Sequence, residues 1–155
     1  MTQTKINAQV IKKLRDATGA RMMDCKKALE KTAGNFDQAI KAVEEAGLAR
    51  AEKNQDRATT AGTVASYVHN NGKIGALVEI QCETDFVAKN EEFQTMAKDI
   101  AMQVAAMNPQ DVAELLAQDF IKDASVTVET LIKSLSGKTG EKMQLKRFTR
   151  LELGN

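Results

Sequence analysis

The sequence contains no tryptophan and one tyrosine, and aromatic residues make up only 4% of it. Proteins that bind single-stranded nucleic acid without sequence preference stack bases on aromatic side chains, so this composition argues against that class. The chain also lacks an excess of one charge, because 21 Asp and Glu residues oppose its 22 Lys and Arg residues. General binding to a phosphate backbone needs a pronounced basic surface. We therefore predict no direct contact with nucleic acid.

Long apolar runs and metal-type cysteine motifs are absent as well. No apolar stretch approaches the length that spans a bilayer, and the first residues lack the apolar segment of a signal peptide. The two cysteines, Cys25 and Cys82, lie far apart and show no metal-ligand spacing, which favours two reduced thiols. We predict a soluble, cytoplasmic protein that makes no membrane contact and holds no metal or cofactor.

Residues 1–47 have the pattern of three short helices joined by turns that contain glycine. Asn7 and Asn35 are suited to cap the first and the third helix. Gly34 ends the second helix in this interpretation, and Gly47 ends the third. A helical module of this size buries little surface on its own. Such modules commonly present an exposed apolar edge to a partner.

Residues 48–61 are polar and predict an exposed helical linker, and residues 62–155 predict a second module with mixed structure. Two alternating runs, at 62–68 and 74–81, flank Asn71-Gly72, the preferred dipeptide of a type I′ hairpin turn. Because Leu77 and Val78 place apolar groups on both faces, we expect the second strand to be covered on both sides. Further periodic segments predict helices and one closing strand, over residues 90–107, 111–118, 126–136 and 143–153. The fold class is therefore α+β, with a small antiparallel sheet packed with helices.

No motif in the sequence supports an enzyme. Ser136-Gly137-Lys138-Thr139 resembles part of a phosphate-binding loop, but that motif needs a glycine where Ile132 stands, so a polar turn is the better interpretation. His69 is the only histidine, and it has no nucleophile or second histidine near it in sequence. We predict that the protein is not an enzyme and has no catalytic residues.

The segment from Thr84 to Val87 is the most informative part of the chain, because it lies where a strand pattern changes to a helix pattern. Thr84 and Asp85 are both suited to cap the N-terminus of a helix. Phe86 is either a core residue or an aromatic ring offered to a partner, and the residues alone favour the core. Met22 and Met23 leave two alternatives equally open, adaptable contact with a partner or gap-filling between helices.

Three segments together resemble one family, bacterial elongation factor Ts. Residues 10–29 read VIKKLRDATGARMMDCKKAL, residues 75–90 read GALVEIQCETDFVAKN, and residues 147–154 read RFTRLELG. Each is similar to a signature of that family, and they occur in the family's order. The resemblance implies a ubiquitin-associated-like three-helix domain followed by an α+β core. It also implies a guanine nucleotide exchange factor that binds elongation factor Tu and promotes GDP release.

The resemblance also implies roles for particular residues. Phe86 would be a wedge that enters elongation factor Tu beside its magnesium site, with Asp85 as the polar group next to it. The whole inserted segment would be Thr84, Asp85, Phe86 and Val87. The contact made by the N-terminal module would involve Leu14, Met22 and Met23.

The chain departs from the family pattern in two ways. Arg21 replaces a glycine, which is expected to put a long cation at the edge of the N-terminal contact. The chain is also short, and short members of the family pair their single cores, so we predict a homodimer, for which the edge of a three-stranded sheet offers a route. The alternative to an exchange factor is a diverged, truncated relative that binds its partner as an adaptor without exchanging nucleotide.

Overall fold

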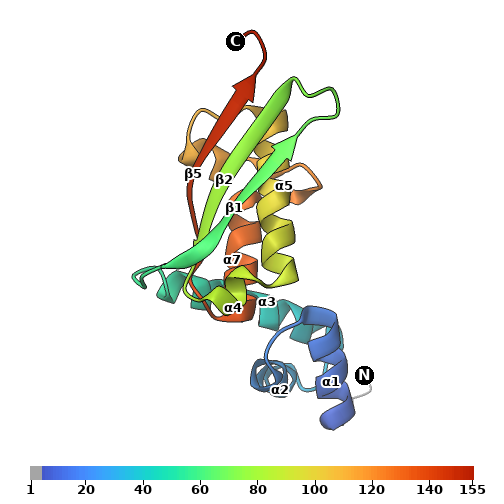
Figure 1. Cartoon of the computed structure of the whole chain (residues 1–155). Coiled ribbons are helices and arrows are strands. Elements are labelled where there is room, and N and C mark those ends of the chain that lie inside the picture. Colours follow the sequence, from blue (N-terminus) through green and yellow to red (C-terminus); the bar gives the residue numbers. More distant parts are fainter. Residues whose placement is uncertain (1–4) are drawn as a thin grey trace.

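A computed structural model describes residues 5–155, which form a helical module followed by a sheet with helices on one face (Figure 1). The N-terminal helices are α1 (Ala8–Thr18), α2 (Met22–Lys31) and α3 (Phe36–Lys53). The strands are β1 (Ala61–Val68), β2 (Ile74–Cys82), β3 (Asp119–Phe120), β4 (Asp123–Thr127) and β5 (Gln144–Glu152). The remaining helices are α4 (Asp85–Ala88), α5 (Glu91–Met107), α6 (Val112–Ala117) and α7 (Val128–Thr139). The predicted α+β class is confirmed.

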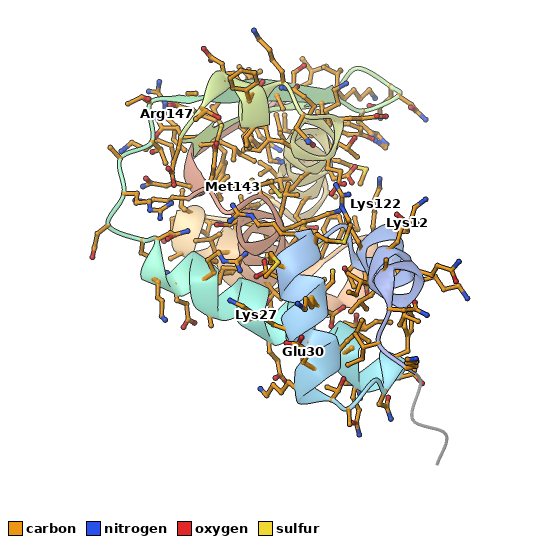
Figure 2. All side chains as sticks on the ribbon, turned by 90° about the horizontal axis from the view of Figure 1, so that it is seen from below. Lys12, Lys27, Glu30, Lys122, Met143 and Arg147 are labelled. Atoms are coloured by element: carbon orange, nitrogen blue, oxygen red, sulfur yellow. The ribbon has the colours of Figure 1, made fainter. Side chains whose placement is uncertain are left out.

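The helical module has its own small core, and the helix caps predicted from the sequence are present in it. The side chains of Asn7 and Asn35 accept hydrogen bonds from backbone N–H groups in the first turns of α1 and α3. The fully buried residues of this core are Leu14, Cys25, Leu29 and Ala39. Figure 2 shows Lys12 on α1 and Lys27 on α2 at the outer surface, while Met143 lies inside the second module.

Helix α3 does not stop at Gly47, so the predicted helix end is wrong. It continues to Lys53, and Ala51 and Asn54 beyond the glycine are buried rather than part of an exposed linker. Glycine in a helix is unfavourable by about 1 kcal/mol relative to alanine, which is why it suggests an end. Here tertiary packing outweighs that preference, because α3 crosses α7 with Gly47 directly against Gly137. The expected module boundary thus falls inside one continuous helix that joins the two modules.

The three-stranded sheet is antiparallel with the order β1-β2-β5 and confirms the predicted strands. One face carries Ala76, Val78, Ile80 and Cys82 of β2 into the main core, against α5 and α7. The opposite face is open, and Leu77 on it is 47% exposed. The prediction that β2 is covered on both sides is therefore wrong, since no helix among residues 5–155 packs on that face (Figure 1).

The connection between β1 and β2 is longer than the predicted two-residue type I′ turn. That turn needs positive φ at both central residues, but among residues 69–74 only Gly72 has a positive φ, of 68°. The backbone N–H of Gly72 donates to the His69 carbonyl, and that of Lys73 donates to the Asn71 side chain. The Asn71 amide stabilises a wider loop, and this explains why a dipeptide rule failed here.

The final third of the chain holds two further differences from the sequence predictions. Ser136 and Gly137 are buried in the last turns of α7, which ends at Thr139 and is capped by Gly140, so they do not form a polar turn. The short β3–β4 ribbon was not predicted, and it depends on the buried Gln103, whose side chain donates to the Asp119 carbonyl and accepts from the Ile121 N–H. Among residues 5–155, no helix combines the length and apolarity needed to cross a bilayer.

Candidate functional site

The corner segment, Thr84–Val87, connects the central strand to a single helical turn. Thr84 has an extended backbone and caps α4, because its Oγ1 accepts from the Val87 N–H at 3.5 Å. Asp85 is the first residue of that turn, where a negative charge is favourable next to the free N–H groups of the helix. The predicted cap is thus confirmed for Thr84, while Asp85 lies one position inside the helix.

Phe86 is exposed over 90% of its surface, the largest fraction among the exposed large apolar residues of the described chain. The interpretation of Phe86 as a core residue is therefore wrong. In a turn of four residues only one side can face the core, and Val87 and Ala88 occupy that side. Leaving a large apolar side chain in water forgoes roughly 1.5–3 kcal/mol of burial. Aromatic residues, phenylalanine among them, are enriched at protein–protein interfaces relative to the rest of the surface.

Glu141, in the loop between α7 and β5, holds the corner segment from outside the strand. Its Oε2 accepts the backbone N–H groups of Glu83 at 3.2 Å and Thr84 at 3.1 Å. Its Oε1 accepts the Thr84 hydroxyl at 2.6 Å. Nothing in the local sequence points to Glu141, because Thr84 and Glu141 lie 57 residues apart.

The N-terminal candidates fall into two groups. Met22 and Met23, at the start of α2, are 42% and 59% exposed, which favours partner contact over gap-filling for this pair. Leu14 is 0% exposed, so its side chain supports the module core and does not offer a surface. A direct contact from this module therefore depends on the methionine pair, Met22 and Met23.

The sequence suggested that Arg21 would place a cation at the edge of the N-terminal contact, but its side chain does not project there. Its guanidinium folds back toward the end of α7, where Nη2 donates to the Thr139 carbonyl at 3.0 Å. Arg50 of α3 acts similarly, with one nitrogen 3.0 Å from the Gly137 carbonyl and the other 2.8 Å from Asp24. Cations near a helix C-terminus are favourable because the free carbonyls carry partial negative charge. The N-terminal module is thus attached to the same end of α7 that leads into Glu141.

The remaining candidates for chemistry are dispersed. His69 is within hydrogen-bond distance of the Tyr67 hydroxyl, at 3.3 Å, at the far end of β1 from the corner segment. No group of three or more His, Cys, Asp or Glu residues within residues 5–155 could hold a metal ion. The two cysteines are buried and not bonded to each other.

We expect both thiols to be unreactive in the folded protein. Burial raises the pKa of the Cys82 thiol to about 11, with the nearby Glu141 carboxylate adding to the effect. Burial also raises the pKa of Cys25. Because the thiolate is the reactive form, alkylation by iodoacetamide at pH 8 should be negligible over hours, as mass spectrometry would show.

Unfolding in urea should make both cysteines react within minutes, and an exposed Ser134→Cys variant should react in the folded state. The raised pKa of Cys82 also makes folding stability depend on pH. The unfolded chain ionises its Cys82 thiol near pH 9 and the folded chain near pH 11, so folding stability should fall as pH rises between these values. Rapid alkylation of the native protein at pH 8 would contradict this account.

The fold and the site define a chain of two attached modules that displays an exposed aromatic side chain on a rigid corner, an arrangement suited to binding another protein. The family model described as elongation factor TS matches residues 83–155. Elongation factor Ts of the Rhodomonas salina chloroplast is 40% identical over 196 positions, which cover 97% of this chain and 90% of the relative. Elongation factor Ts of Desulforamulus reducens is 40% identical with the same coverage. For Solidesulfovibrio magneticus the identity is 40%, over 96% of this chain and 97% of the relative.

The chain belongs to the elongation factor Ts family and is thus a translation elongation factor. The family predicted from the three sequence segments is confirmed. The alignments extend over 194 to 196 positions, whereas this chain has 155 residues, so these relatives contain residues that this chain lacks.

Proposed function

We propose that the protein is a guanine nucleotide exchange factor that binds elongation factor Tu and accelerates the release of GDP. The observation that carries the proposal is Phe86, which is 90% exposed on a corner whose backbone is fixed by Thr84 and Glu141. A ring on a rigid mount can enter a partner without first losing conformational freedom, which favours tight binding.

The corner segment would act on the magnesium and phosphate site of the partner. In this proposal Phe86 inserts beside that site and Asp85 supplies the adjacent polar group, with Thr84 and Val87 completing the inserted segment. The methionine pair would contact the same domain of the partner. Factor and nucleotide then weaken each other's binding, and the coupling is reciprocal by thermodynamic necessity. Because no covalent bond is made or broken, this function needs no catalytic residue, and the protein would not be an enzyme.

The decisive experiment measures release of fluorescent GDP from elongation factor Tu by stopped flow, with the factor varied over a wide concentration range. The proposal expects the rate to rise with concentration and then to saturate. An unchanged rate at every concentration would overturn it. Binding without acceleration, seen by calorimetry in the same range, would select instead the adaptor, the alternative suggested by the short chain.

We further propose that two copies pair through the open face of the sheet. Exposed apolar side chains gather there from all three strands, namely Val64, Val68, Leu77 and Leu151. Glu79 and Arg147 form an ion pair of 2.6 Å across neighbouring strands on the same face, and this gives the face both charges for self-complementary contact.

Sedimentation equilibrium at micromolar concentration should therefore report a dimer. Leu77→Lys should shift the protein to a monomer, because it places a charge at the centre of this face. Ile121→Lys, at an exposed apolar residue outside the sheet, is the matched control and should remain dimeric. A monomeric wild-type protein at these concentrations would contradict the pairing.

A further inference from the structure

The segment of residues 139–142, which comprises the last residue of α7 and the loop after it, is bonded both to the helical module and to the end of β2. On one side it binds the helical module. The Thr139 carbonyl accepts from Arg21, next to the methionine pair, and the Gly140 carbonyl accepts from Asn54 and Arg57, which follow α3. On the other side it binds the end of β2 through Glu141. This segment therefore connects the two surfaces that the proposed function requires.

Glu83 and Glu141 each accept hydrogen bonds from the backbone of the segment that carries the other, a reciprocal arrangement that we call the carboxylate clasp. The Glu141 carboxylate accepts the N–H groups of Glu83 and Thr84, and the Glu83 carboxylate accepts the Lys142 N–H at 2.6 Å. Hydrogen bonds to charged acceptors are stronger than those between neutral groups. Arg57, with Nη1 at 3.3 Å from Glu83 Oε1, adds an ion pair to the clasp.

The clasp orients the corner segment as well as holding it against the loop after α7. The last residue pair of the β1–β2 ladder is Ala61 with Cys82, so the N–H groups of Glu83 and Thr84 lie beyond the sheet. Glu141 accepts both of them with one oxygen and accepts the Thr84 hydroxyl with the other. Because the same hydroxyl caps α4, Glu141 fixes the oxygen that starts the turn carrying Phe86.

We propose that Glu141 is a positioning residue for nucleotide exchange: it never touches the partner, but it sets the angle at which Phe86 enters it. This inference rests on the proposed exchange function. Loss of the carboxylate leaves the exposed Phe86 and the methionine pair in place, so initial binding persists. The ring then occupies a range of directions, and the step that expels GDP becomes slower. Misplacement of a reacting group by about 1 Å can lower a rate by roughly 100-fold.

The test compares Glu141→Ala, Glu141→Gln and the wild-type protein in the stopped-flow GDP-release assay. For Glu141→Ala we expect the saturating rate to fall roughly 10- to 100-fold, while the concentration giving half the maximal effect changes less than about threefold. Glu141→Gln should lose only part of the rate, because its amide oxygen still accepts the two backbone N–H groups. Glu129→Ala is the matched control on α7, because the Glu129 carboxylate forms an ion pair with Lys133 at 3.0 Å. This variant should release GDP at the wild-type saturating rate.

A second readout separates positioning from general destabilisation. Hydrogen exchange measured by NMR should show the amides of Glu83 and Thr84 exchanging at least about tenfold faster in Glu141→Ala, with the amide of Ile100 in α5 unchanged. This measurement needs no partner. It therefore tests whether Glu141 holds the Glu83 and Thr84 backbone even if the wild-type protein does not accelerate GDP release and the proposed function is wrong.

Two results would overturn the inference. One is a Glu141→Ala protein with the wild-type saturating rate, and the other is unchanged exchange of the Glu83 and Thr84 amides. If Glu141→Ala does not fold, the saturating rate of Glu141→Gln decides the matter, because its amide keeps an acceptor for the two N–H groups but places an NH2 group where the carboxylate accepts the Thr84 hydroxyl. A reduced saturating rate supports positioning, and the wild-type rate refutes it.

Discussion

Replacing Phe86 by alanine is expected to lower the saturating rate of GDP release by about 30-fold or more while leaving the fold intact. Anchoring aromatic residues at protein interfaces contribute roughly 2–4 kcal/mol when truncated, and each 1.4 kcal/mol is a factor of ten. The ring is 90% exposed in the free protein, so its removal opens no cavity. The free energy of unfolding in urea should therefore stay within about 0.5 kcal/mol of the wild-type value.

The control for this variant is Ile121→Ala, which removes an exposed apolar side chain from the β3–β4 ribbon. It should release GDP at the wild-type rate, since it lies outside the corner segment. Equal rates for Phe86→Ala and the wild-type protein would show that Phe86 is not the wedge. A loss of both rate and folding stability in Phe86→Ala would instead mean that the ring supports the fold, in conflict with its exposure.

Periodicity identified the long elements because each spans several turns or alternations. Helix α5, from Glu91 to Met107, buries an apolar stripe over more than four turns. The turn that carries Phe86 has only four residues, too few for any period to show which side is buried. For this reason the residues alone favoured the core for Phe86. Only the resemblance to elongation factor Ts favoured the alternative, a ring offered to a partner.

Glycine rules failed where tertiary contact decides the outcome. Gly47 was interpreted as a helix end and Gly137 as part of a polar turn, yet each lies inside a helix at one crossing point. Local sequence cannot distinguish a glycine that ends a helix from one that lets two helices approach. The same limit applies to Glu141, because its partner Thr84 lies 57 residues away. Contacts of this separation depend on the path of the whole chain.

The open face of the sheet shows that the pattern of one strand cannot predict what covers each of its faces. Leu77 follows the pattern of a strand buried on both sides, but no helix in the described chain covers it. An apolar residue on an exposed face is consistent with the homodimer that we propose. In that case the pattern of β2 reports burial in the assembly rather than in one chain.

Replacing Gly137 by alanine is expected to destabilise the attachment of the helical module strongly. A Cβ atom at position 137 would lie within 2.5 Å of the Gly47 Cα and closer still to its carbonyl, and these are backbone atoms that cannot turn aside. The gain in helix propensity from glycine to alanine is about 1 kcal/mol, whereas overpacking costs roughly 1–3 kcal/mol or more. Helices α3 and α7 must then separate, which also breaks the bond from Arg50 to the Gly137 carbonyl. Urea denaturation should show a loss of at least about 1 kcal/mol, and GDP release should weaken because the methionine pair is displaced from the corner segment.

Gly47→Ala is the matched control, because the two glycines of this crossing are not equivalent. A Cβ atom at position 47 would lie 3.7 Å from the Gly137 Cα, which is ordinary van der Waals contact. Its backbone is helical, so alanine should leave stability unchanged or raise it by up to about 1 kcal/mol. The asymmetry between the two variants distinguishes a specific close approach at Gly137 from a general need for flexibility at the joint. If both substitutions destabilise equally, flexibility is the better account, and if both are neutral, the helices do not cross this closely in solution.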